Sequence, residues 1–406
     1  MSTEKGVPFS RNPQDAWSIF DDDVAFPTVV LLDSALSHNV RVMAEYCASA
    51  EVSIAPHGKT TMTPRIFERQ LEDGAWAITA ASAWQAMRMR EAGVNRVLIA
   101  NQVVMPGELA WLAQAIDSGF NVYCYVDSVD GVEIMGAAME QADVSSPLPV
   151  LLEVGVEGGR TGARTLEEAL AVAEVADASP WLALTGTAGF EGIITATETA
   201  TAGELVDAFL DRIVDVTHAV ASNGWFDPTP EVIVTAGGSA YFDHVVDRFS
   251  YVDIPDPIRV VIRSGCYITH DDGGYDRSSP LGLTPRVAGE RFIPAIEVWG
   301  PVLSRPEPGL VIVGVGKRDV THDGLLPLAK KIRRRDGNGV ITIEPIRVRA
   351  LNDQHTYLDV DPAFGLRVGD LVGFGISHPC LTFDKWRSMS VVDDGYNVIE
   401  VADTGF

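Results

Sequence analysis

Residues 150–168 have the sequence VLLEVGVEGGRTGARTLEE, which contains the three parts of a β-loop-α unit. The largely apolar run from Val150 to Val156 is typical of a strand with both faces buried, as in a parallel sheet. A glycine-rich loop follows, and Thr165 precedes Leu166-Glu167-Glu168, a pattern typical of a helix start. The stretch therefore predicts a strand, a polar loop and a helix that covers the sheet.

The same unit recurs between about residues 50 and 270. Helical segments with start signals at Thr63-Pro64 and Ser82 separate the apolar runs. Eight parallel strands with crossover helices predict an α/β fold of the (β/α)8 TIM barrel type, and the alternative is an open, doubly wound sheet. The predicted strands are 52–55, 75–79, 96–101, 122–127, 150–156, 183–189, 232–237 and 259–264.

The pattern changes after Tyr275 to short strands without helical periodicity, which predicts a C-terminal all-β domain. The extended segment Thr28 to Asp33 precedes the first barrel strand, and we expect it to pair with that domain. The predicted barrel domain covers 34–270, and the β-domain covers 1–33 and 271–406. The predicted β-domain strands are 294–301, 310–315, 340–347, 356–360 and 370–375.

Composition excludes several classes of protein. A formal net charge of -25 opposes binding to nucleic acid or to an anionic membrane surface, and no apolar window reaches the length of a membrane span. The basic run 330–335 ends at Asp336-Gly337-Asn338-Gly339, which predicts a hairpin tip. Four cysteines without paired spacing, and an N-terminus without a signal-like stretch, favour a cytoplasmic protein.

Three loops that follow predicted strands carry candidate binding residues. Residues at the C-terminal ends of barrel strands converge on one mouth, where a partly desolvated Lys59 could lose its charge and attack an aldehyde. Glycine loops allow backbone N–H groups to approach an anion closely, so two of them on the last two strands predict a phosphate site. These loops contain Gly237, Gly238, Ser239, Gly265, Cys266 and Tyr267.

Two further groups complete the candidate site. Arg160 follows the fifth strand and could hydrogen-bond the phenolic oxygen of an aromatic ring or stack on its face. His378 and Cys380 are two residues apart, so on an extended segment both point to one side and could bind one metal ion. Imidazole and thiolate suit zinc, and the third ligand could be His355, which is also a candidate catalytic residue, or water.

Taken in order, these motifs resemble the D-serine dehydratase and D-threonine aldolase family of pyridoxal phosphate (PLP) enzymes with an alanine racemase-like fold. The resemblance covers most of the chain, from Phe26-Pro27-Thr28 onward, and its most specific block is Pro56-His57-Gly58-Lys59-Thr60. It implies that Lys59 binds the cofactor covalently and that Arg160 lies near its phenolic oxygen. It also implies a homodimer, a cofactor phosphate near Gly237, Gly238, Gly265 and Tyr267, and a metal ion at His378 and Cys380.

The second metal ligand distinguishes activities within this family. The dehydratases resemble this chain in having a cysteine there, whereas the aldolases have an aspartate and prefer manganese. Cys380 therefore favours a dehydratase with zinc, and Mn²⁺ or Mg²⁺ are the alternative ions. The chain departs from the family at Phe190, where a tyrosine is expected, and at Gly58, where a bulkier residue is common.

The predicted reaction is the removal of water and then ammonia from a small D-3-hydroxy amino acid such as D-serine or D-threonine. Lys59 is the candidate base, and the metal ion would activate the hydroxyl as a leaving group. The alternative is an aldolase that releases glycine and an aldehyde. A racemase would need a second acid/base, for which Tyr267 and Tyr275 are candidates, and a non-catalytic PLP carrier would not need the β-domain.

Overall fold

The computed structural model describes residues 5–8, 16–227, 230–337 and 339–406. The chain divides into two compact units, one formed by Met1–Met43, Thr60–Ile66 and Cys266–Phe406 and the other by Ala44–Lys59 and Phe67–Gly265. Helices α1 (Asp33–Ser49) and α2 (Pro64–Glu72) have residues in both units. Residues 1–4 and 9–15 of the predicted N-terminal β-segment, Pro228 and Thr229 of one predicted loop, and Asn338 of the predicted hairpin tip lie outside the described residues.

The second unit is an eight-stranded parallel sheet in the order β2-β9-β8-β7-β6-β5-β4-β3. The two end strands are joined by a bridge between His57 and Thr79, where the Thr79 amide donates to the Pro56 carbonyl at 2.8 Å, so the sheet closes on itself. The strands are β2 (Ser53–Ile54), β3 (Ile78–Ala80), β4 (Arg96–Gln102), β5 (Asn121–Val126), β6 (Leu148–Val154), β7 (Leu182–Gly189), β8 (Val232–Ala236) and β9 (Ile258–Ile262).

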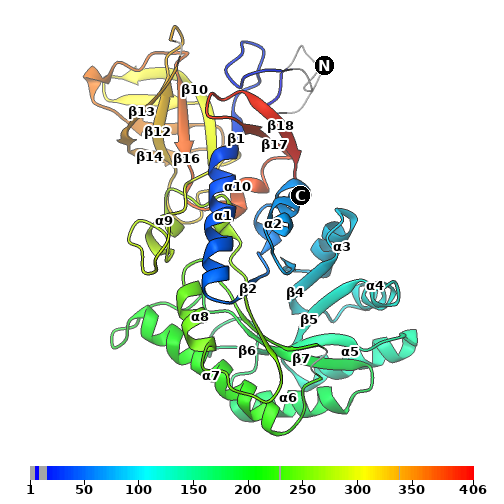
Figure 1. Cartoon of the computed structure of the whole chain (residues 1–406). Coiled ribbons are helices and arrows are strands. Elements are labelled where there is room, and N and C mark those ends of the chain that lie inside the picture. Colours follow the sequence, from blue (N-terminus) through cyan, green and yellow to red (C-terminus); the bar gives the residue numbers. More distant parts are fainter. Residues whose placement is uncertain (1–4, 9–15, 228–229, 338) are drawn as a thin grey trace. The chain divides into compact units, whose positions relative to one another are not determined.

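Helices follow these strands and lie outside them, as Figure 1 shows for α4 to α7. Thr165 begins α6 with a capping box, because its hydroxyl accepts from the Glu168 amide while the Glu168 carboxylate accepts from the Thr165 amide. Ser82 caps α3 in the predicted way. The helices of this unit after α2 are α3 (Ala83–Glu91), α4 (Pro106–Asp117), α5 (Val129–Ala142), α6 (Leu166–Ala178), α7 (Ala202–Ser222) and α8 (Phe242–Phe249).

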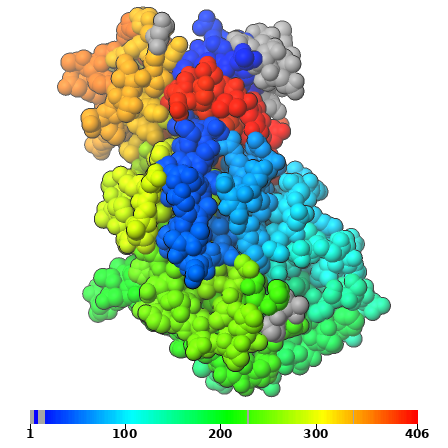
Figure 2. Space-filling model, in the orientation of Figure 1, coloured from blue at the N-terminus to red at the C-terminus, as the bar shows by residue number. Residues whose placement is uncertain are grey.

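The interior of the barrel is filled by side chains rather than open. One buried cluster takes residues from six strands and from positions next to the other two, with small alanines just after β2, just before β3 and on β7, and larger side chains on the others. The same unit is drawn as spheres, largely in cyan and green, in Figure 2. The cluster consists of Ala55, Ala77, Leu98, Tyr125, Leu151, Ala188, Ile233 and Val261.

The first unit is built on a ten-stranded sheet with the path β13-β12-β16-β10-β1-β17-β18, and β11, β15 and β14 branch from β10. The N-terminal strand β1 pairs with β10 and β17, which confirms the expected pairing of Thr28 to Asp33 with the β-domain. The strands are β1 (Thr28–Leu32), β10 (Ile296–Glu307), β11 (Leu310–Val313), β12 (Leu328–Arg333), β13 (Val340–Ile346), β14 (Val348–Leu351), β15 (Thr356–Asp359), β16 (Leu371–Gly375), β17 (Ser388–Val392) and β18 (Val398–Asp403).

The core of this sheet forms around Trp299, which is buried with Trp17, Val30 and Tyr396. Glu297 is also fully buried, and its carboxylate accepts hydrogen bonds from the Trp299 indole at 3.0 Å and the Tyr396 hydroxyl at 2.9 Å. The unit also contains short helices: η2 (Cys266–Ile268), α9 (Gly274–Ser278), η3 (Pro362–Phe364) and α10 (Cys380–Phe383).

The predicted fold class is confirmed: a closed, parallel (β/α)8 barrel and a mostly β-stranded C-terminal part are both present. All eight predicted barrel strands match observed strands. Four strands of the β-domain, β12, β14, β17 and β18, were not predicted. Within the described residues, no helix is sufficiently long and apolar to span a membrane.

Candidate functional site

The barrel unit has a cavity of about 220 Å³ at the C-terminal ends of its strands. Each strand contributes a lining residue from its C-terminal end or from the loop after it, as expected for a barrel of this type. The polar residues that line the cavity include His57, Lys59, Tyr125, Glu153, Arg160 and Arg263. The structure therefore brings the predicted residues Lys59, Arg160 and Gly237 together.

Lys59 is positioned by the short helix η1 (Gly58–Thr60), which begins four residues after β2. A Cβ atom at position 58 would lie 2.6 Å from Met89 Cε, 2.7 Å from Ile78 Cγ2 and 2.9 Å from Phe67 Cε1. These side chains fill the space that a larger residue would need. The close packing around position 58 therefore explains why a glycine is present at this departure from the family pattern.

His57 is half-buried, and its Nδ1 atom is buried without a hydrogen-bond partner among the described residues. Burial holds the pKa of the imidazole well below its usual value, and the charges of Lys59, Arg263 and Arg160 lower this pKa further. The ring is therefore neutral near pH 7. It adds no charge to a cavity that already has three cationic side chains nearby.

Arg263 is fixed at the end of β9 by two hydrogen bonds. Its guanidinium donates to Thr235 Oγ1 and to the Gly189 carbonyl, both at 2.7 Å, and the group is only 3% exposed. Its Nε atom and the Tyr125 hydroxyl are buried and have no hydrogen-bond partner in the part of the chain that the structure describes. Sequence reasoning had not singled out either residue.

These unpartnered atoms test whether a polar cofactor fits the cavity. A buried polar atom without a partner is costly, so a cluster of them around one cavity points to a polar ligand. Here the atoms are His57 Nδ1, Tyr125 Oη and Arg263 Nε, beside the amine of Lys59. A heteroaromatic aldehyde with a phosphate group, such as PLP, suits this combination.

Arg160 and Glu153 also line this cavity. The guanidinium of Arg160 lies 4.2 Å from the centre of the Phe190 ring, so the phenylalanine at the second departure from the family pattern provides a face for this cation. Glu153 accepts a hydrogen bond from Gln102 Nε2 at 2.7 Å. Burial raises the pKa of this carboxyl group above its usual value.

The first predicted phosphate loop follows β8, and its amides already have an acceptor. The Gly238 amide donates to Glu191 Oε1 at 2.6 Å, and Ser264 Oγ donates to the Gly238 carbonyl at 2.9 Å. A Cβ atom at Gly237 would lie 2.6 Å from the Arg263 backbone nitrogen, which explains the glycine there. Ser239 and Gly265 are both buried. Sequence reasoning missed Glu191, which directly follows the quoted Phe190.

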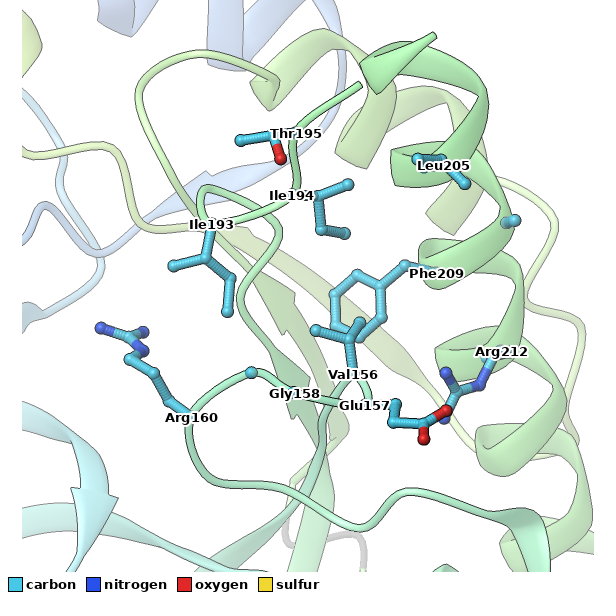
Figure 3. A pocket seen from close by; sticks show the side chains of 12 residues that line it. Val156, Glu157, Gly158, Arg160, Ile193, Ile194, Thr195, Leu205, Phe209 and Arg212 are labelled. Carbon is cyan, nitrogen blue, oxygen red and sulfur yellow. The ribbon is translucent and has the colours of Figure 1, made fainter. Parts of the chain in front are cut away.

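A larger hollow of about 670 Å³ lies beside the loop that carries Arg160. Figure 3 shows Val156, Ile194 and Phe209 around it, with Phe209 provided by α7. Arg160 lines this hollow as well as the cavity that contains Lys59, but Lys59 does not line it. The smaller cavity is the candidate cofactor site because it contains the amine.

The other unit contains a group of possible metal ligands, Cys266, His378 and Cys380, whose ligand atoms all lie within 4.8 Å of one another. The two sulfur atoms are 3.9 Å apart. The Thr60 hydroxyl lies 3.5 Å from the Cys380 sulfur and 3.8 Å from the Cys266 sulfur. His378 Nδ1 lies 2.9 Å from Asp323 Oδ2. Imidazole and thiolate donors at this spacing fit a zinc ion.

The three side chains of this group have pKa values shifted in different directions. A hydrogen bond with Cys266 and the neighbouring His378 lower the pKa of Cys380 well below its usual value, while the hydrogen bond with Cys380 and burial raise the pKa of Cys266. The contact with Cys380 raises the pKa of His378 to about 9. The pair of His378 and Cys380 therefore has the character of an imidazolium and a thiolate before a metal binds.

The remaining predicted residues differ in their positions relative to this group. His355 is exposed in the turn between β14 and β15, and it is not part of the ligand group found among the described residues. Tyr267 is buried with its ring 5.9 Å from that of Phe292. Tyr275 contacts Cys266, and the charge of that cysteine raises the pKa of its hydroxyl. Cys266, which was predicted to belong to a phosphate loop, lies among the possible metal ligands.

Comparison with known proteins finds relatives of both the barrel and the β-rich part of the chain. Residues 33–253 match the family model described as alanine racemase, N-terminal domain, and residues 295–392 match that described as a putative serine dehydratase domain. Among curated relatives, the D-threonine aldolase of Arthrobacter sp. is 26% identical over 94% of this chain and 93% of its own length. The 3-hydroxy-D-aspartate aldolase of Paracoccus denitrificans (strain Pd 1222) is 23% identical over 79% of this chain and 81% of its own length.

Solved structures share the fold of the chain. The D-threonine aldolase from Filomicrobium marinum has a TM-score of 0.77 at 24% identity and covers 94% of this chain and 95% of its own. The D-threo-3-hydroxyaspartate dehydratase from Delftia sp. HT23 has a TM-score of 0.71 at 18% identity, with 93% and 97% covered. The predicted assignment to PLP-dependent lyases of this kind is confirmed. The chain belongs to the alanine racemase N-terminal domain family, and a serine dehydratase-type domain follows its barrel.

Proposed function

We propose that this protein is a PLP- and metal-dependent dehydratase that converts a small D-3-hydroxy amino acid to a 2-oxo acid and ammonia. The observation that carries the proposal is the contact between His378 and Cys380, whose imidazole and thiol side chains are donors suited to zinc. Solved structures of D-threo-3-hydroxyaspartate dehydratase include alanine variants of a histidine and of a cysteine two positions later, the cysteine variant in a metal-free form. The same spacing separates His378 and Cys380.

The barrel residues would hold the cofactor and the substrate amine. Bound PLP supplies an aldehyde for amines and a ring that withdraws electrons from the α-carbon. Lys59 would hold the cofactor and, when released as a neutral amine, would remove the α-proton. Arg263 is held by two hydrogen bonds and would present a fixed positive charge to the cofactor. Arg160 lines the same cavity and would donate a hydrogen bond to the phenolic oxygen of the cofactor.

The proposed metal ligands would assist the loss of the hydroxyl group from C3 of the substrate. Hydroxide is a poor leaving group, and a Lewis acid on the C3 oxygen lowers the barrier to its loss. His378 and Cys380 would hold that ion, and Asp323 would orient the histidine ring. Thr60, which contacts Cys380, directly follows Lys59 in the sequence.

A product assay tests the proposal. The purified protein would be incubated with D-serine, D-threonine and D-3-hydroxyaspartate, with and without a chelator. We expect pyruvate, 2-oxobutanoate or oxaloacetate together with ammonia, and a loss of turnover on chelation. Turnover that persists after complete metal removal would exclude the metal from the reaction.

The second candidate is an aldolase, and it is favoured by the relatives rather than by the ligand group. Both curated sequence relatives named above are aldolases, and one aligns over 94% of this chain. An aldolase would release glycine and an aldehyde from D-threonine without ammonia. The product therefore separates the two functions in one experiment. We also expect a homodimer, which sedimentation of the PLP-bound protein would test.

A further inference from the structure

We propose that Cys266 is a third protein ligand of the metal ion, so that the site is a Cys2His centre with one position left for the substrate oxygen. This inference deepens the proposed function, because it rests on the presence of a metal ion at His378 and Cys380. It does not depend on which bond of the substrate breaks. It predicts a stronger preference for zinc over manganese or magnesium than a His-Cys pair alone would impose.

The distance between the two sulfur atoms supports shared ligation. Two thiolates bound at about 2.3 Å to one tetrahedral zinc ion are separated by about 3.8 Å, whereas octahedral corners at the same bond length would be about 3.3 Å apart. The observed separation between Cys266 Sγ and Cys380 Sγ is 3.9 Å. The sulfurs are therefore already placed at a tetrahedral edge, too far apart for a disulfide bond of about 2.05 Å.

The surrounding residues orient the ligands as they do in other zinc sites. His378 Nδ1 is occupied by Asp323 Oδ2, which leaves Nε2 as the ring nitrogen for a metal ion. The Thr60 hydroxyl lies within 3.8 Å of both sulfur atoms and could donate to a thiolate. Three ligands held in this way leave the fourth tetrahedral position open, as catalytic zinc sites require.

Cys266 also differs in kind from the other buried cysteines. Cys47 and Cys124 are buried within the barrel unit, and neither belongs to a group of possible metal ligands among the residues described. Cys266 comes directly after the β9 loop, 114 residues before Cys380, so its contact with Cys380 arises from the fold. A second thiolate added to an imidazole and a thiolate strengthens the preference of the site for zinc over manganese or magnesium.

The direct test counts the sulfur atoms around the ion. X-ray absorption fine structure at the zinc edge would be recorded on the full-length, PLP-containing protein, loaded with one equivalent of zinc under a thiol reductant. We expect two sulfur neighbours per zinc. One sulfur per zinc would overturn the proposal, and this measurement needs no variant.

Zinc affinity provides the second test. Competition with a chromophoric chelator would compare the parent protein with Cys266→Ser, and with Cys47→Ala as a control for the loss of one buried thiol. We expect Cys266→Ser to bind zinc more than about 100-fold more weakly, because losing even a residue that only orients a ligand costs about 10-fold to 100-fold. Equal affinities of Cys266→Ser and Cys47→Ala would contradict a role for Cys266 as a ligand.

The outcomes separate this inference from the proposed function. Two sulfur atoms per zinc in a protein that makes only glycine from D-threonine would keep the Cys2His site and exclude the dehydratase. One sulfur atom per zinc in a protein that makes 2-oxobutanoate from D-threonine would exclude the Cys2His site and keep the dehydratase. A disulfide between Cys266 and Cys380 that persists under reductant, with no zinc bound, would also overturn the proposed site.

Discussion

The Gly238 amide donates a hydrogen bond to the Glu191 carboxylate at 2.6 Å, at the turn where the sequence predicts a phosphate loop. Glu191 is fully buried, and its second oxygen has no partner among the described residues. Burial raises the pKa of this carboxyl group. The side chain therefore acts as an internal acceptor that holds the loop after β8 against the loop after β7.

Replacing Glu191 separates the effect of the acceptor from that of the charge. Glu191→Ala removes the acceptor of the half-buried Gly238 amide, and we expect it to lower the free energy of unfolding by about 1–3 kcal/mol. Glu191→Gln keeps an acceptor oxygen and should stay close to the parent protein. Denaturant titration of the cofactor-free protein measures both, and equal losses in the two variants would contradict the role of the hydrogen bond.

Gly58 gives a second prediction about packing. In Gly58→Ala the added methyl group would meet Met89 Cε at 2.6 Å, and we expect a loss of about 1–3 kcal/mol in the free energy of unfolding. The matched control is Gly107→Ala, where a Cβ atom has no neighbour within 4 Å. A Gly58→Ala variant as stable as this control would show that Met89 and its neighbours move aside easily.

The barrel was predictable because its signals are local. Each buried strand is an apolar run, and caps such as Ser82 and Thr165 mark the helix that follows. Strand β12 was missed because its sequence, LAKKIR, places two lysines in a sheet. The fold supplies their partners, since Lys330 binds Asp272 at 2.9 Å and Lys331 binds Glu297 at 2.6 Å. The sequence around Lys330 and Lys331 does not indicate these partners, because Asp272 and Glu297 are far from them in the chain.

The candidate site was predictable where its residues are close together in the sequence. The spacing of His378 and Cys380 along the chain is visible in the sequence, and so is Lys59 after a strand. Cys266 and Asp323 are 114 and 55 residues from their partners, so their contacts depend on the packing of the β-rich unit. His355 illustrates the converse, because its residue type suggested a ligand while its exposed turn does not bring it to the group.

Lys59 is the residue whose covalent chemistry can be observed directly. We expect borohydride reduction of the PLP-loaded protein to attach the cofactor to the peptide that contains Lys59, as detected by mass spectrometry. Lys59→Ala should lose this adduct and reduce turnover by at least about 100-fold, because it removes the candidate base. Lys317→Ala, an exposed lysine, is the control. An adduct on another lysine in the parent protein would contradict the assignment.

Asp323 should affect the metal site without binding the metal. Removing a carboxylate that orients a ligating histidine typically weakens metal binding by about 10-fold to 100-fold. We expect this loss of zinc affinity in Asp323→Ala, measured by chelator competition. Asp353→Asn, at a side chain that is 71% exposed, serves as the control. Unchanged affinity in Asp323→Ala would mean that the contact with His378 Nδ1 does not orient the ring.

His57 makes the stability of the cofactor-free protein depend on pH. Its pKa in the folded state is well below the usual 6.5, chiefly because of burial and then because of the Lys59 and Arg263 charges. Below pH 6.5 the unfolded chain therefore binds a proton that the folded chain does not, so the stability present above this pH is lost as the pH falls. The loss is up to about 1.4 kcal/mol for each pH unit below 6.5 until the folded pKa is reached. Unfolding at pH 7.5 and pH 5.5 should differ less in His57→Gln than in the parent protein, and equal differences would show that other groups determine the acid sensitivity.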